Sequence, residues 1–263
     1  MRGDPVSGPA GVTALVLAET VAGGLVLLFL TPLWDEVKRG FFTLTGSILF
    51  ALSLAAWGSS SAALVPGSEA GRWSVRTAAA LALVNMLWVG LLFAKRFTAA
   101  RVVGVASVPV AVAVLAAMAG TAEGSWIVAF LQLLGGAAFL GAVLSGLLLG
   151  HWYLTDRRLT RTPINRTTNF LFAGVVLEAV ALLIGGFGPS DATSEFNPLL
   201  TSAGLASWIA LGMVGATALI AVMIRLTLRT DRSSAVQAAT GFFYLAVITA
   251  LTAEFAAKIG FLP

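Results

Sequence analysis

The sequence predicts an all-α fold, a polytopic integral membrane bundle of eight transmembrane helices with both termini outside. Of its 263 residues, 58% are hydrophobic and only 11% are charged, whereas soluble domains carry about 25% charged residues. Apolar runs long enough to cross a bilayer, about 20 residues each, recur along the whole chain. The basic residues gather in alternate loops between these runs, as expected of a chain that threads a membrane repeatedly.

Eight apolar runs are the predicted spans, and they are Val12–Leu33, Phe41–Trp57, Val75–Ala94, Val102–Gly120, Trp126–Tyr153, Phe170–Gly188, Leu199–Leu226 and Ala235–Ile259. The longest loop, about Gly58–Ser74, leaves no room for a separate domain outside the membrane. We therefore treat residues 1–263 as a single transmembrane domain. Pro109 lies inside the fourth run and is expected to kink that helix or end its first half.

The distribution of charge predicts the orientation of the chain. One side holds both termini and four of the 16 basic residues, namely Arg2, Arg72, Arg76 and Lys258. The other side holds the remaining twelve, and short loops rich in Lys and Arg stay in the cytoplasm. We expect a plasma (inner) membrane protein with cytoplasmic basic loops that contact anionic lipid headgroups. Nucleic-acid binding is not expected, because the basic clusters lack interleaved aromatic residues and any recognisable binding motif.

Composition also excludes several kinds of site. The chain has no cysteine and one histidine, so disulfides, thiol nucleophiles, iron–sulfur ligation and a bis-histidine haem cannot be built from this protomer alone. No metal site and no covalently bound cofactor are predicted.

Two carboxylates lie deep within predicted spans. Glu19 is about seven residues into the first run, and Glu178 is about eight residues into the sixth. They enter from opposite faces and reach similar depth, so they could meet near the middle of the membrane. Ionisable groups at this depth are costly and usually face a partner or a water-filled cavity. We interpret both as candidates for a proton relay, with hydrogen-bonded packing between helices as the alternative.

Three further sets of polar or small residues are candidates for other roles. Glu254 and Lys258 are spaced i,i+4 near the outer end of the last run, which favours a structural ion pair or interfacial anchor. His151 and Tyr153 lie at the cytoplasmic end of the fifth run and Asn85 lies within the third; they are candidates for binding quinone, or for interfacial and interhelical contacts. Four-residue spacings predict close helix packing in the fifth run, at Ala137, Gly141, Ser145, Gly146 and Gly150.

The first two runs resemble a known family. The segment Glu19 to Gly24 is followed by an apolar stretch, a short charged loop and a new helix that starts at Lys38-Arg39-Gly40. This arrangement is similar to the opening of the polysulfide-reductase-type (NrfD-like) membrane subunits, as are the chain length and the eight spans. The resemblance implies a cofactor-free helical subunit that binds quinone and passes electrons or couples protons with an iron–sulfur partner. It covers about the first 55 residues, and it assigns no quinone-binding residue here.

The leading functional hypothesis is a membrane subunit of a respiratory or other electron-transfer complex. It hosts a quinone site or a proton path and anchors partner subunits that carry the redox centres. A proton-coupled transporter or channel is the first alternative; it predicts paired broken helices, yet the sequence shows an interruption only at Pro109. A structural membrane scaffold is the second alternative.

Overall fold

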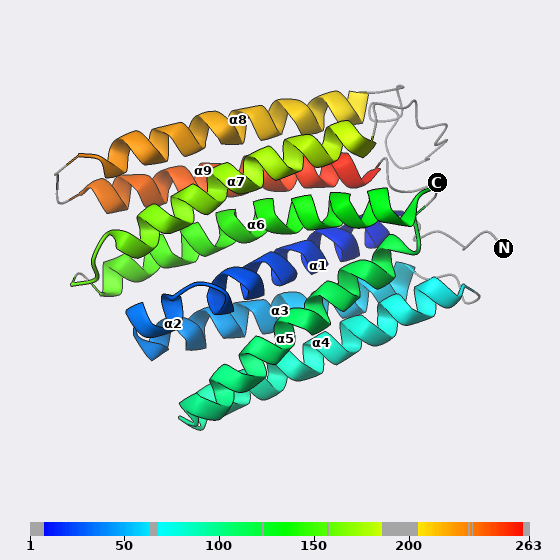
Figure 1. The fold of residues 1–263 in the computed structure, drawn as a ribbon, viewed down its shortest axis with the longest axis horizontal. Helices are drawn as coiled ribbons and strands as arrows, with labels where there is room; N and C mark the ends of the chain where they lie inside the picture. The colour runs from blue at the N-terminus through cyan, green and yellow to red at the C-terminus, as the bar shows by residue number, and fades with distance from the viewer. Residues whose placement is uncertain are drawn as a thin grey trace.

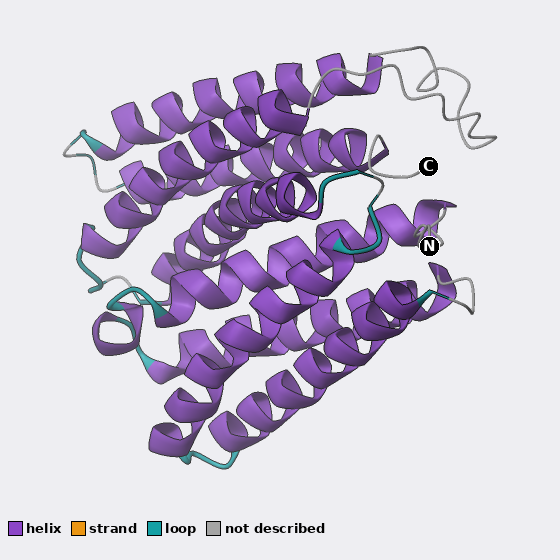
Figure 2. Ribbon diagram, turned by 45° about the vertical axis from the view of Figure 1, so that its right-hand side comes forward, coloured by secondary structure: helices purple, strands orange, loops and turns teal. Residues whose placement is uncertain are grey.

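The computed structural model describes residues 8–63, 68–122, 124–156, 158–185, 205–230, 232 and 234–259, and this part of the chain is helical, without strands (Figures 1 and 2). Its helices are α1 (Gly8–Phe29), α2 (Leu33–Glu36), α3 (Arg39–Ala63), α4 (Glu69–Phe93), α5 (Phe97–Ala119), α6 (Trp126–Thr155), α7 (Thr162–Gly185), α8 (Leu205–Leu228) and α9 (Ala235–Ile259). All except α2 are long and apolar enough to span a bilayer. The all-α fold with eight spans is confirmed, and the protein is a multi-pass membrane protein.

Several helices are longer than their apolar runs. α3 and α4 extend to Ala63 and from Glu69, so they occupy most of the predicted loop Gly58–Ser74. Ser68 caps α4, because its hydroxyl oxygen accepts a hydrogen bond from the Gly71 amide at 3.1 Å. α7 starts at Thr162, eight residues before the predicted Phe170. Apolar length understates these helices because their polar or small-residue end turns, the last turns of α3 and the first turns of α4 and α7, continue beyond the apolar runs.

Prolines lie within both α5 and α7. Pro163 sits in the first turn of α7, where proline is tolerated because its missing amide would have no intrahelical partner. α5 continues through Pro109, so the proline does not end the helix. The start of the predicted run Leu199–Leu226 and the end of Phe170–Gly188 lie outside the described residues.

The bundle is built from two four-span halves that follow the chain order (Figure 1). In the first half α1 packs on α3 and α5, and α4 packs on α3 and α5. In the second half α6 packs on α7 and α9, and α8 packs on the same two helices. The halves meet where α1 lies against α6 and α9. α1 is the central helix, because 72% of the residues in its most apolar stretch are buried inside the protein. The corresponding share for α8 is 28%.

Glycines let the helices at this joint approach each other closely. A Cβ added to Gly23 of α1 would lie 1.8 Å from the Ala137 carbonyl oxygen of α6, and one added to Gly141 would lie 2.3 Å from Gly23 backbone. On the other faces of α6, Gly146 makes room for the Phe243 ring and Gly150 for the Thr240 side chain, both on α9. Small residues thus pack α6 at the positions that the four-residue spacings predict.

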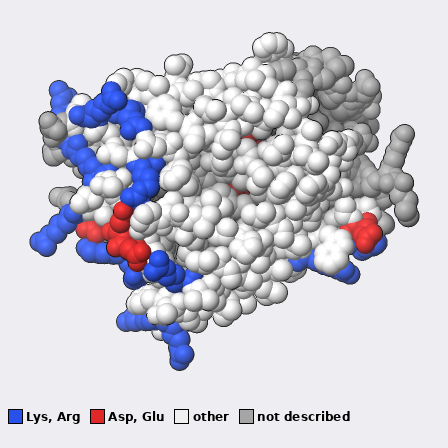
Figure 3. All heavy atoms as spheres, viewed as in Figure 1, with Lys and Arg blue, Asp and Glu red and all other residues white. Residues whose placement is uncertain are grey.

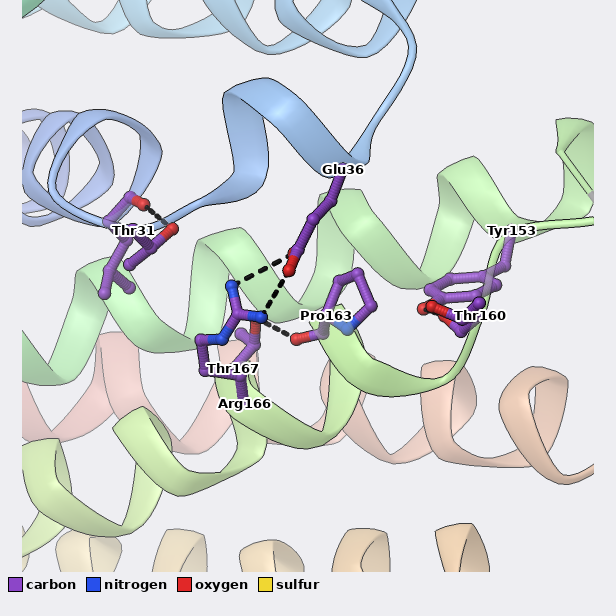
Figure 4. A network of polar contacts seen from close by, with 8 residues as sticks. Thr31, Glu36, Tyr153, Thr160, Pro163, Arg166 and Thr167 are labelled. Carbon is purple, nitrogen blue, oxygen red and sulfur yellow. Dashed lines mark hydrogen bonds and ion pairs between the residues drawn. The ribbon is translucent and has the colours of Figure 1, made fainter.

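The two ends of the bundle differ in charge. Lys and Arg side chains gather at the end that carries α2, which we call the basic end (Figure 3). The described residues there form ion pairs around α2: Arg166 of α7 binds Glu36 through two contacts of 2.6 and 3.0 Å (Figure 4), and Arg101 of α5 binds Asp35. α2 therefore ties α5 to α7 across the two halves. We call the other end, where α1 and α6 begin and α7 and α9 end, the opposite end.

Candidate functional site

Four ionisable side chains meet inside the membrane-spanning part of the bundle, at the joint between the halves. Glu19 comes from α1, Glu178 from α7, and Glu254 and Lys258 from α9. Their exposed fractions are 0%, 1%, 0% and 2%. We call these residues the carboxyl–lysine cluster. Red atoms show deep within the otherwise white middle of the space-filling view (Figure 3).

Lys258 bridges two carboxylates. Its Nζ atom lies 2.8 Å from Glu19 Oε1 and 3.1 Å from Glu254 Oε2. The contact with Glu254 is the i,i+4 pair that the spacing predicts, but it lies in the interior, whereas the sequence suggested an anchor near the outer end. The contact with Glu19 joins α9 to α1 and so links the two halves. Sequence reasoning missed this second contact because the residues lie far apart in the chain.

Glu178 is the third carboxyl of the cluster. It lies close enough to Glu254, Lys258 and Glu19 to interact electrostatically with all three. Its Oε2 atom has no hydrogen-bond partner among the described residues. A buried oxygen without such a partner is uncommon and costly in a native structure. The structure thus brings Glu19 and Glu178 into one cluster, although each belongs to a different half.

Two consecutive glycines of α6 make space for the carboxyls. A Cβ on Gly136 would lie 2.5 Å from Glu19 Oε1 and 2.9 Å from Glu254 Oε2. A Cβ on Gly135 would lie 2.7 Å from the Cβ of Ala181 and 3.0 Å from Glu178 Oε2. A side chain at either position would require the neighbouring atoms to shift. In the sequence, the adjacent glycines Gly135 and Gly136 within an apolar run are the signal for this close packing. They were not among the predicted functional residues.

The depth of Glu178 differs from the expectation. It is 16 residues after the start of α7 at Thr162 and seven residues before Gly185, so it lies nearer the opposite end than the predicted eight residues from the cytoplasmic side implied. The early start of α7 is the reason. The two glutamates can still meet because Glu19 lies near the middle of α1.

The charges of the cluster do not balance when every group is ionised. Three carboxylates and one ammonium would leave two negative charges in a buried interior, where the neighbours include the backbone of Gly135 and Gly136 and the Ala181 side chain. Unpaired charges in an apolar interior are strongly disfavoured, and such groups usually neutralise by binding a proton. The arrangement is therefore suited chemically to holding and exchanging protons.

The structure places the three remaining candidate residues elsewhere. Asn85 of α4 donates a 2.7 Å hydrogen bond to Ser53 Oγ of α3. The Tyr153 hydroxyl donates to the Thr160 carbonyl oxygen (Figure 4), so it closes the turn between α6 and α7. His151 is exposed near the end of α6. These residues are not brought together with one another or with Glu19, Glu178, Glu254 and Lys258.

Replacing Ser53 by alanine is expected to weaken the contact between α3 and α4. The change leaves the Asn85 amide without its partner at a site where both side chains are almost fully buried. Interhelical hydrogen bonds in membrane proteins contribute about 0.6 kcal/mol on average and up to about 1.7 kcal/mol. Reversible unfolding in mixed detergent should show a loss in this range. Ser61→Ala, an exposed hydroxyl that bonds only within α3, serves as control and should change stability less.

Among the described residues, no group of three His, Cys, Asp or Glu side chains is arranged to hold a metal ion. Comparison with family models, curated proteins and solved structures found no match.

Proposed function

We propose that the protein is an integral membrane subunit of a respiratory or other electron-transfer complex. In this proposal the carboxyl–lysine cluster relays protons, and partner subunits carry the redox centres or deliver the quinone. The protein lies in the plasma (inner) membrane with its basic end in the cytoplasm, as the excess of Lys and Arg at that end favours.

One observation carries the proposal: three carboxyls, Glu19, Glu178 and Glu254, share the single lysine Lys258, and the exposed fraction of each of the four residues is at most 2%. An ion pair that served only to hold helices together would need one carboxyl for one lysine. Intramembrane acids grouped with a basic residue are typical of proton relays.

The geometry supports a relay. Glu178 holds the exchangeable proton, and a second proton on Glu19 or Glu254 leaves one carboxylate to balance the ammonium of Lys258. When the Glu178 proton leaves, the ammonium of Lys258 is attracted toward the new negative charge on Glu178. When a proton returns, that attraction weakens. Only a proton moves and no covalent bond of the chain changes, so the electron chemistry belongs to the partners.

The basic end supports an assembly role. Lys95, Arg96, Arg158 and Arg229 are exposed there. They are placed to contact anionic headgroups and acidic faces of peripheral subunits.

Purification in mild detergent, with identification of the co-purifying proteins and an absorbance spectrum, tests the proposed assembly with redox subunits. Iron–sulfur or haem proteins are expected. Solute uptake by vesicles that contain this chain alone would overturn the complex-subunit proposal and favour a transporter.

Replacing Glu178 by glutamine tests the relay. The substitution keeps the size of the side chain and removes the exchangeable proton. Proton-coupled turnover of the complex in native membranes should fall by about 100-fold or more, while the amount of assembled complex stays unchanged. Glu69→Gln is the matched control, because Glu69 is exposed in the first turn of α4 and should be silent. Full coupled turnover in the Glu178→Gln variant would contradict the proposal.

A further inference from the structure

Three members of the carboxyl–lysine cluster, Glu178, Glu254 and Lys258, lie nearer the opposite end than the basic end along their helices. Lys258 is one residue and Glu254 five residues before α9 ends at Ile259, and Glu178 is seven residues before α7 ends at Gly185. At a rise of about 1.5 Å per residue, the backbone of both glutamates lies within about 10 Å of the helix ends at the opposite end. The same helices extend about 24 Å or more from the cluster to the basic end.

The route toward the basic end is closed by close packing. Four residues beyond Glu19, the α1 backbone at Gly23 meets the α6 backbone at Ala137 and Gly141, where even an added Cβ would clash. Further along, the Phe243 ring fills the space over Gly146 between α9 and α6 and is fully buried. We call these contacts the glycine–phenylalanine layer. A layer with backbone in contact and an aromatic ring in the remaining space leaves no volume for a chain of water molecules.

The route toward the opposite end has different packing. On this side of the acids, the last turns contain small buried residues: Ala181 lies three residues beyond Glu178 on α7, and Ala256 lies two residues beyond Glu254 on α9. Gln132 of α6 is half-buried one turn before Gly136, and its amide lies against Gly185. Its amide both donates and accepts hydrogen bonds, so it is suited to pass a proton between water and the cluster.

We infer that the carboxyl–lysine cluster exchanges protons with one side of the membrane only, the side of the opposite end, through Gln132, and that the glycine–phenylalanine layer is the barrier to the other side. The ionisable groups that face one another are Glu19 from α1, Glu178 from α7, and Glu254 and Lys258 from α9, while α6 contributes the backbone of Gly135 and Gly136. The inference rests on the proposed proton relay and adds its direction.

The chain has no native cysteine, so a single introduced cysteine is the only thiol of the protein that can react in an accessibility test. Single cysteines are introduced at Gln132, on the side of the opposite end, and at Ser145, which is buried in α6 beyond Gly141. Oriented vesicles are treated from either side with a membrane-impermeant charged methanethiosulfonate. Gln132→Cys should react from the opposite-end side at least ten times faster than from the basic-end side, and Ser145→Cys should stay unmodified from both.

A second variant tests the barrier itself. Phe243→Ala removes the ring over Gly146 and should make Ser145→Cys reactive toward the same reagent. Reaction of Ser145→Cys from the basic end without that change, or no reaction of Gln132→Cys from either side, would overturn the inference. If Gln132→Cys does not assemble, Ala181→Cys replaces it with the same expectation. Labelling reports the access route even when coupled turnover is absent, so failure of this inference and failure of the proposed function are distinguishable.

Discussion

Replacing Lys258 by methionine is expected to destabilise the bundle by about 3–5 kcal/mol, the usual cost of removing one partner from a buried ion pair. Lys258 contacts Glu19 at 2.8 Å and Glu254 at 3.1 Å, and all three side chains are at most 2% exposed. Methionine has a similar length but no charge, so it leaves two carboxylates without their counter-ion. The free energy of unfolding, measured by steric trapping or reversible denaturation in mixed detergent, checks the prediction.

Two companion variants separate the buried ion pair from a general effect of losing a lysine. Lys258→Met combined with Glu19→Gln and Glu254→Gln removes all three charges and should recover most of the lost stability, because neutral replacement of a buried ion pair is often tolerated. Lys38→Met removes a cation that is 71% exposed and pairs with Asp156 at 3.0 Å. It should cost no more than about 1 kcal/mol. Equal losses in Lys258→Met and Lys38→Met would contradict the burial that the structure gives Lys258.

The Gly23→Ala substitution is expected to have the second large effect. The new Cβ would lie 1.8 Å from a backbone oxygen of α6, and backbone cannot rotate away as a side chain can. α1 and α6 must therefore separate, which lengthens the contact between Glu19 and Lys258 and opens the joint between the halves. Overpacking of this kind typically costs about 1–3 kcal/mol, and a backbone contact places it at the upper end. Unfolding in detergent, together with the yield of assembled protein, measures the loss.

Gly215→Ala is the matched control for Gly23→Ala. Gly215 also lies within a spanning helix, but nothing is within 4 Å of its added Cβ. Alanine there should leave stability unchanged or raise it by up to about 1 kcal/mol, since glycine is the poorer helix former. A Gly23→Ala protein as stable as Gly215→Ala would show that α1 and α6 do not pack through their backbones.

The sequence was sufficient for the number and type of the helices, because the length of an apolar run and the alternation of basic loops report directly on crossing a bilayer. It was less informative about where helices begin. The polar first turn of α7, which contains Pro163 and Arg166, lies outside the apolar run, yet its ion pair with Glu36 holds it in helical form beside α2. The apolar pattern of the sequence does not indicate an ion pair between residues this far apart in the chain.

The candidate site was predictable in its members and less so in its arrangement. The depth of Glu19 and Glu178 within apolar runs predicted these two as a proton relay, whereas the i,i+4 spacing of Glu254 and Lys258 predicted a structural ion pair. The contact between Lys258 and Glu19 joins residues at opposite ends of the chain, so no local pattern could indicate it. The space for these acids depends on Gly136, whose role appears only once α6 is placed between α1 and α9.

In the proposed relay, Glu178 carries an exchangeable proton inside the membrane. Infrared difference spectroscopy on the reconstituted protein, recorded between acidic and alkaline buffer, measures this directly through the carbonyl stretch of a protonated carboxyl group. We expect such a band, sensitive to hydrogen–deuterium exchange, which Glu178→Gln removes and Glu69→Gln leaves intact. A spectrum without a pH-dependent carboxyl band, or with a band that Glu178→Gln leaves unchanged, would contradict the proposed relay.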